Sequence, residues 1–179
     1  MGGFSGSTEI SVGSVPIFVA IGDFNDDGKQ DLAVANSGAT NTVSIRLGDG
    51  SGGFSGSTEV SMASATSSVA IGDFNGDGKR DLAAVSYNSN TVSIRLGNGM
   101  GGFSGSTEVS LGDYPFSVAI GDFNGNGTQD LAVTNSNSSS VSIRLGDGLG
   151  GFGGSTEVSV GSGPRTVAIG EFNGDGKQD

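Results

Sequence analysis

The sequence predicts an all-β protein, a β-propeller built from four-stranded antiparallel blades. Three observations support this fold class. One unit of 49–50 residues recurs about three and a half times, apolar residues alternate with polar or small ones over short runs, and glycine-rich turns separate those runs. Four-stranded units that repeat every 40–50 residues or so are typical of propeller blades.

The repeat is visible in the positions of matching residues. Phe4, Phe54, Phe103 and Phe152 open equivalent segments and are spaced by 50, 49 and 49 residues. We therefore expect a single repeat domain over residues 1–179. Its units are a partial one at 1–18 with a fourth strand, blades at 19–67, 68–116 and 117–165, and a partial one at 166–179 with a first strand and an acidic loop.

The strands follow from residue alternation within each unit. In Val43–Leu47, apolar residues alternate with Ser44 and Arg46, which is the pattern of a half-buried strand. Residues 57–97 contain four such runs, with the sequences STEVSM, SVAIGDF, DLAAVS and TVSIRLG, between turns rich in glycine and asparagine. Turns of this composition favour hairpins, so we expect antiparallel neighbours.

Composition and charge exclude several classes of protein. With a net charge of −11 the chain repels nucleic acid and anionic membranes, so we expect neither as a partner. There is no cysteine and no histidine, which removes disulfides, thiolate metal sites and the commonest general base. No apolar run approaches the roughly 20 residues that span a bilayer. We also expect no enzymatic activity, because no base is evident that could activate a serine.

The partial units at the two ends bear on assembly. The expected units leave three whole blades, whereas propellers usually have about four to eight. We therefore expect either that copies of the chain associate as a homo-oligomer to complete a ring, or that the sequence belongs to a longer propeller chain.

An acidic loop follows the first strand of every unit. In the second loop, Asp73, Asn75, Asp77 and Asp81 place side-chain oxygens at positions one, three, five and nine, and the position-seven carbonyl of Lys79 could point inward. Several oxygens, some of them anionic, with no nitrogen or sulfur donor, are the ligands that Ca²⁺ prefers. The loop is not an EF-hand, because position twelve lacks the glutamate that an EF-hand requires.

We therefore expect Ca²⁺ as the cofactor of four loops. The alternative is a solvated turn, since aspartate, asparagine and glycine are good turn formers. Of the 19 acidic residues, 11 occupy the expected ligand positions, and such crowding is repulsive unless a cation offsets it. Weaker binding is expected in the third loop, where Asn126 replaces an acid, and in the fourth, which begins with Glu171. The expected ligands are Asp23, Asn25, Asp27, Lys29 and Asp31; Asp73, Asn75, Asp77, Lys79 and Asp81; Asp122, Asn124, Asn126, Thr128 and Asp130; and Glu171, Asn173, Asp175, Lys177 and Asp179.

The same residues resemble a known family. The acidic loops, with Phe152–Gly153 and Gly163–Pro164, resemble the FG-GAP/VCBS repeats of integrin α-subunit propellers and their bacterial relatives. The resemblance implies calcium that rigidifies the hairpin between the first and second strands of each blade. It also implies an extracellular or cell-surface adhesion or recognition module, without fixing a ligand. Phe4, Phe54 and Phe103 depart from the motif because serine follows each.

Three arginines recur at one position of the third strand of each unit, namely Arg46, Arg95 and Arg144. One interpretation is a ring of cations that recognises an anion. The interpretation that we prefer is a repeated cross-strand ion pair with the glutamate of the next strand.

We interpret the chain as a non-catalytic, calcium-stabilised binding or adhesion module with an unidentified protein or glycan ligand. One alternative is a carbohydrate-binding propeller lectin, although the chain has no tryptophan and only two tyrosines, Tyr87 and Tyr114, as sugar platforms. Another alternative is a purely structural or engineered repeat scaffold that assembles into a ring.

Overall fold

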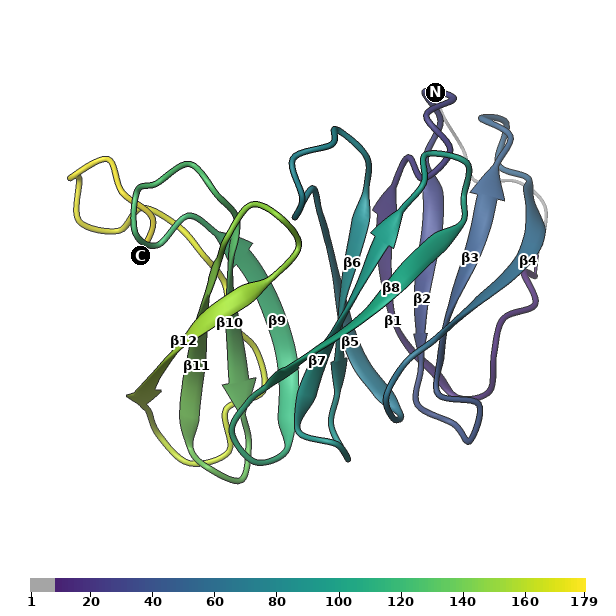
Figure 1. The fold of residues 1–179 in the computed structure, drawn as a ribbon. Coiled ribbons are helices and arrows are strands. Elements are labelled where there is room, and N and C mark those ends of the chain that lie inside the picture. Colours follow the sequence, from purple (N-terminus) through teal and green to yellow (C-terminus); the bar gives the residue numbers. More distant parts are fainter. Residues whose placement is uncertain (1–8) are drawn as a thin grey trace, which may run out of the picture.

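The computed structural model describes residues 9–179, whose twelve strands form three four-stranded antiparallel sheets (Figure 1). The first sheet contains β1 (Pro16–Gly22), β2 (Asp31–Asn36), β3 (Thr42–Gly48) and β4 (Phe54–Ser61). The second contains β5 (Thr66–Gly72), β6 (Asp81–Ser86), β7 (Thr91–Gly97) and β8 (Phe103–Ser110). The third contains β9 (Pro115–Gly121), β10 (Asp130–Asn135), β11 (Ser140–Gly146) and β12 (Phe152–Ser159). Within each sheet, strands that follow one another in sequence are hydrogen-bonded neighbours.

The predictions of an all-β chain and of four antiparallel strands per unit are confirmed. Strands β4 and β5 begin a few residues earlier than the alternation alone predicted, at Phe54 and Thr66. The described residues include no helix that could cross a membrane.

The two partial units differ from expectation. Residues 160–179 form no strand, although a first strand was expected within 166–179. In each sheet the first strand pairs with the strand that starts at position nine of the acidic loop. Asp179 is that position in the last loop, so only the first residue of a partner strand lies within this sequence. The fourth strand expected within 1–18 falls partly outside the described residues, and residues 9–15 form no strand.

The sheets pack against one another through their first strands. Figure 1 shows them side by side in chain order, with β5 in contact with β1 and β2, and β9 in contact with β5 and β6. Between the first two sheets, Phe24, Val43 and Ile45 pack against Val69 and Leu82. A second core repeats this arrangement between the second and third sheets. The middle sheet is therefore packed on both faces, in keeping with the short side chains of Ala83 and Ala84 on β6.

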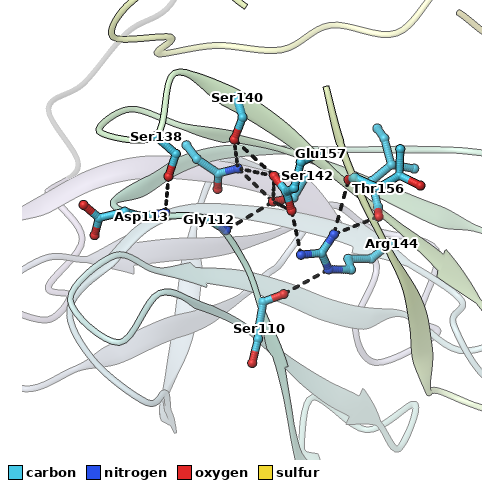
Figure 2. A network of polar contacts seen from close by, with 11 residues as sticks. Ser110, Gly112, Asp113, Ser138, Ser140, Ser142, Arg144, Thr156 and Glu157 are labelled. Carbon is cyan, nitrogen blue, oxygen red and sulfur yellow. Dashed lines mark hydrogen bonds and ion pairs between the residues drawn. The ribbon is translucent and has the colours of Figure 1, made fainter. Parts of the chain in front are cut away.

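A buried arginine ties the second and third sheets to the preceding sheet, and the first sheet to Ser11. On β11, the Arg144 guanidinium donates through Nε to the Ser110 carbonyl oxygen of β8 at 2.9 Å and through NH2 to Glu157 Oε1 of β12 at 2.8 Å (Figure 2). The prediction of a cross-strand ion pair is confirmed, while the bond to the preceding unit was not predicted. The equivalent ion pairs in the other two sheets are Arg46–Glu59 at 2.8 Å and Arg95–Glu108 at 2.9 Å. The Nε atoms of Arg46 and Arg95 donate to the carbonyl oxygens of Ser11 and Ser61 at 2.8 and 3.0 Å.

The glutamate in this network is strongly hydrogen-bonded. Glu157 accepts bonds from the Ser140 and Ser142 hydroxyls at 2.8–3.1 Å as well as from Arg144 (Figure 2). Burial alone would raise the pKa of Glu157, but the hydrogen bonds from Arg144, Ser142 and Ser140 outweigh it and lower the pKa below its ordinary value of 4.5.

We expect the free energy of unfolding to fall as the pH drops through the lowered pKa of Glu157. A carboxyl whose pKa is lower in the folded state stabilises fully above its unfolded pKa, and this contribution is lost as the pH falls through the folded value. Urea denaturation at about pH 7 and about pH 3 should show Glu157→Gln to be less stable than the wild type at the higher pH, with a smaller decrease on acidification. Equal decreases in the two proteins would contradict this role of Glu157.

Candidate metal centres

The acidic loops lie along one edge of the row of sheets, the upper edge in Figure 1. Three of them join the first and second strands of a sheet, between β1 and β2, β5 and β6, and β9 and β10. The fourth, residues 171–179, follows the C-terminal segment that borders the third sheet. The chain therefore presents the same loop repeatedly along one surface.

The side-chain oxygens of positions one and three converge within each loop. In the second loop, Asp73 Oδ1 and Asn75 Oδ1 both accept a hydrogen bond from the Asp77 backbone nitrogen at 3.1 Å. Asp73 Oδ2 accepts from the Gly78 nitrogen at 2.8 Å, and Asp77 Oδ1 from the Lys79 nitrogen at 3.0 Å. Gly78 has a φ of 84°, which lets the chain turn its N–H toward Asp73. The first loop repeats these bonds through Asp23, Asn25 and Asp27, and the third through Asp122, Asn124 and Asn126.

The aspartate at position nine has a different environment. Asp81 is fully buried, and its two carboxylate oxygens accept hydrogen bonds from the backbone nitrogens of Phe74 and Gly97, each at 2.8 Å. It therefore fastens the start of the loop to the end of β7. Asp31 and Asp130 do the same in their sheets. We call the two hydrogen bonds that one buried aspartate accepts from the loop and from the third strand the bracket. Each carboxylate oxygen has a second lone pair, so the bracket does not prevent contact with a cation.

Electrostatics differ sharply between positions five and nine. Burial raises the pKa of Asp81, and the negative charges of Asp77 and Asp73 raise it further, against the opposing N–H groups of Gly97 and Phe74. By contrast, the Lys79 backbone N–H lowers the pKa of Asp77. The three carboxylates of the second loop therefore repel one another, and a bound cation would offset that repulsion.

The donor atoms fit a hard cation such as Ca²⁺ in their chemistry. Within residues 9–179, no three aspartate or glutamate side chains form a group that could hold a metal ion by themselves. An asparagine oxygen and a backbone carbonyl would have to complete any site. In the second loop these donors are Asn75 Oδ1 and the carbonyl of Lys79, beside the carboxylates of Asp73, Asp77 and Asp81. An all-oxygen set suits Ca²⁺ better than zinc or copper.

The four loops differ in charge. Lys29 pairs with Asp27 at 3.3 Å in the first loop, and Lys79 with Asp77 at 3.5 Å in the second. In the third loop the neutral Asn126 accepts from the Thr128 backbone nitrogen at 2.8 Å and from its hydroxyl at 2.6 Å. The fourth loop is exposed throughout, including its position-nine aspartate. The third and fourth loops therefore have the least favourable surroundings for a cation.

The FG-GAP-like repeat family matches residues 23–84, 73–133 and 122–179. The chain belongs to this family. Each match begins at position one of an acidic loop and includes position nine of the next loop. The family's repeat therefore has the same spacing as the repeat seen in the fold.

Solved structures that align with this FG-GAP-like chain include two bacterial proteins. A mutant of the Photorhabdus luminescens Tc holotoxin pore is 22% identical with a TM-score of 0.52, covering 89% of this chain and 8% of the toxin chain. The V. cholerae biofilm matrix protein Bap1 is 22% identical with a TM-score of 0.44, covering 92% of this chain and 27% of that one. The chain thus spans only a small part of either protein. No curated protein matches it.

At the opposite edge of the sheets, the structure brings together the only two tyrosines of the chain. The rings of Tyr87, after β6, and Tyr114, before β9, have centroids 5.3 Å apart. Beside them, Asp113 accepts hydrogen bonds from the side-chain amides of Asn90 and Asn137, each at 3.2 Å. The two tyrosines belong to turns of different units, so their contact could not be predicted from the sequence.

We expect Asp81 to stabilise the fold without any metal. Asp81→Ala leaves the N–H groups of Phe74 and Gly97 without partners, at a cost of about 1–3 kcal/mol each. Urea denaturation in EDTA should therefore show a loss of about 2–6 kcal/mol. Asp77→Ala, at an exposed position of the same loop, is the matched control and should change stability in EDTA by less than about 1 kcal/mol. Equal losses would show that Asp81 has no bracket role.

Proposed function

We propose that this FG-GAP-like chain is a non-catalytic, calcium-stabilised binding or adhesion module. The observation that carries the proposal is the convergence of the oxygens of Asp73 and Asn75 on one N–H group, in a loop that ends at the buried Asp81. The first and third loops repeat this arrangement. Calcium supplies a positive charge that holds these oxygens together. The loop then keeps the hairpin between the first two strands rigid. An extracellular location is consistent with this role, since extracellular modules bind Ca²⁺ at about 10⁻⁴–10⁻³ M.

We expect calcium to raise the thermal stability of the chain. At a concentration of about 100 times the dissociation constant, one site adds about 2.7 kcal/mol, which for a chain of this size corresponds to roughly 5–10 °C in Tm. Thermal melts in EDTA and in about 10–100 mM Ca²⁺, which is about 100 times an extracellular-type dissociation constant, measure the difference. Removing one ligand from each of the first two loops, in an Asp27→Ala and Asp77→Ala double variant, should shrink it. Coincident melts of the wild type would show that the loops are ordinary turns.

We further propose that the sheets are blades of a propeller, completed by a second copy of the chain. The packing of each first strand onto the preceding sheet supports this interpretation. Val69 of β5 is 2% exposed in that packing, whereas its equivalent on β1, Val19, is 53% exposed, and Ile21 is 61% exposed. The outer face of the first sheet therefore has the apolar residues of an inter-blade surface, and another blade fits it.

Light scattering tests this association. We expect a mass that is a multiple of 17.6 kDa for the calcium-loaded chain. Val19→Lys should reduce it to the monomer mass, because the charge cannot be buried against an apolar face. Leu149→Lys, a change at an exposed loop position, is the control and should leave the mass unchanged. A wild-type monomer would overturn the association.

Carbohydrate binding is a second candidate function, favoured by the tyrosine pair. Two aromatic faces beside a carboxylate and two amides provide stacking surfaces and hydrogen-bonding groups for hydroxyls. Tyr114 has a φ of 55°, a strained backbone for an aromatic residue. The equivalent positions at the preceding junction hold Ser37 and Ala65, so the tyrosine pair occurs at one junction only.

A glycan array with the wild type and with Tyr87→Ser and Tyr114→Ala tests this candidate. Each substitution installs the residue that the chain itself uses at the equivalent position. We expect binding to at least one glycan class by the wild type and a loss of about tenfold or more in both variants, with unchanged melts. An array without signal, or signal that both variants retain, would remove carbohydrate binding at this place.

A further inference from the structure

A glutamine at position eight of the acidic loop reaches across to the loop of the preceding sheet. Gln129 Oε1 accepts a hydrogen bond at 3.0 Å from the backbone nitrogen of Asp73, which is position one of the second loop. One unit further on, Gln178 Oε1 accepts at 2.6 Å from the backbone nitrogen of Asp122, position one of the third loop. These are side chain-to-backbone bonds between loops that are 56 residues apart.

The backbone is shaped to admit this side chain. A Cβ atom at Gly72, the residue before Asp73, would lie 2.2 Å from Gln129 Oε1, so a larger residue there would displace the glutamine amide. A hollow between the second and third loops is lined by residues of both loops, including Gly76, Thr128 and Gln129. Neighbouring loops are therefore in direct contact through the glutamine rather than separated by solvent.

The first junction lacks this bond. Arg80 occupies position eight of the second loop, and a guanidinium has donors only, so it cannot accept from the backbone N–H of Asp23. In the described part of the chain no hydrogen bond joins Arg80 to the first loop, and a Cβ at Gly22 would meet Ile71 and Phe24 instead. The chain thus contains an internal comparison between linked and unlinked loops.

We propose that Gln129 and Gln178 are positioning residues that couple cation binding in neighbouring loops, and that Arg80 leaves the first loop uncoupled. The proposal rests on the proposed calcium binding. Gln129 lies between two expected donors of the third loop, the Thr128 carbonyl and the Asp130 carboxylate. A cation that fixes those donors also fixes Gln129, which then holds Asp73 in place. By linkage the effect is reciprocal, so occupation of either loop favours the other.

The test is a Ca²⁺ titration of the full chain followed by NMR, with the backbone amides of Gly28, Gly78 and Gly127 as reporters of the first three loops. In the wild type, we expect Gly78 and Gly127 to titrate together and cooperatively, and Gly28 independently. Gln129→Arg copies the first junction and should weaken binding at the second loop by about fivefold or more, a typical coupling. Arg80→Gln should bring Gly28 into the cooperative group.

The outcomes separate this proposal from the proposed function. If Ca²⁺ moves none of the reporters in the wild type, calcium binding fails, and the coupling fails with it. If Ca²⁺ binds and both variants keep the wild-type midpoints, only the coupling is overturned. Urea unfolding of Gln129→Arg in EDTA is the second readout, because a purely structural glutamine would lower that stability and leave the order of loop filling unchanged.

Discussion

The buried aspartate at the end of each of the first three acidic loops is the interaction on which the rest of the structure depends. Asp81 holds the beginning of its loop and the end of the third strand at the same time. The loop conformation, the register of β5 with β6, and the position of the neighbouring phenylalanine all follow from that bracket. A carboxylate that is fully removed from water is costly unless both oxygens are hydrogen-bonded, and here both are.

The bracket also links the loop surface to the apolar core. Phe74, whose backbone nitrogen is held by Asp81, places its ring against Phe152 of the next sheet, with centroids 5.4 Å apart. Phe24 and Phe103 form the same edge-to-face pair at 5.7 Å one unit earlier. Loop geometry and inter-sheet packing are therefore not separable in this chain. Any ion that tightens the loop acts on the same phenylalanine that seals the junction between sheets.

Much of the fold could be predicted from the sequence because the repeat multiplies weak local signals. A single run of alternating residues such as Val43–Leu47 is weak evidence for a strand. Three copies of the run at a nearly constant spacing identify the strands. The last unit shows the limit of this reasoning. Its Val167–Gly170 run has the same residues as β5, yet it forms no strand, since a strand needs a hydrogen-bonded neighbour and local pattern does not supply one.

The loop residues could be found from the sequence, but the different roles of their acidic residues could not. The spacing predicted that all the acidic residues of a loop are cation ligands. In the structure, Asp81 also joins the loop to the third strand through two backbone hydrogen bonds, which Asp77 does not do. Bonds between units were also missed. The hydrogen bond from Arg144 to the Ser110 carbonyl oxygen joins residues 34 positions apart, and the bond from the Asp73 nitrogen to Gln129 joins residues 56 positions apart. A local sequence pattern does not predict contacts between residues so far apart in the chain.

The arginine that reaches back to the preceding unit has a consequence for how the chain comes apart. Because neighbouring sheets are joined by this bond and by a shared core, the stability of a sheet is the sum of an intrinsic part and a nearest-neighbour part. The middle sheet has neighbours on both sides and the outer sheets have one fully formed neighbour each. Opening should therefore start at the outer sheets and move inward, so that amide exchange is slowest in β6, at the centre of the array.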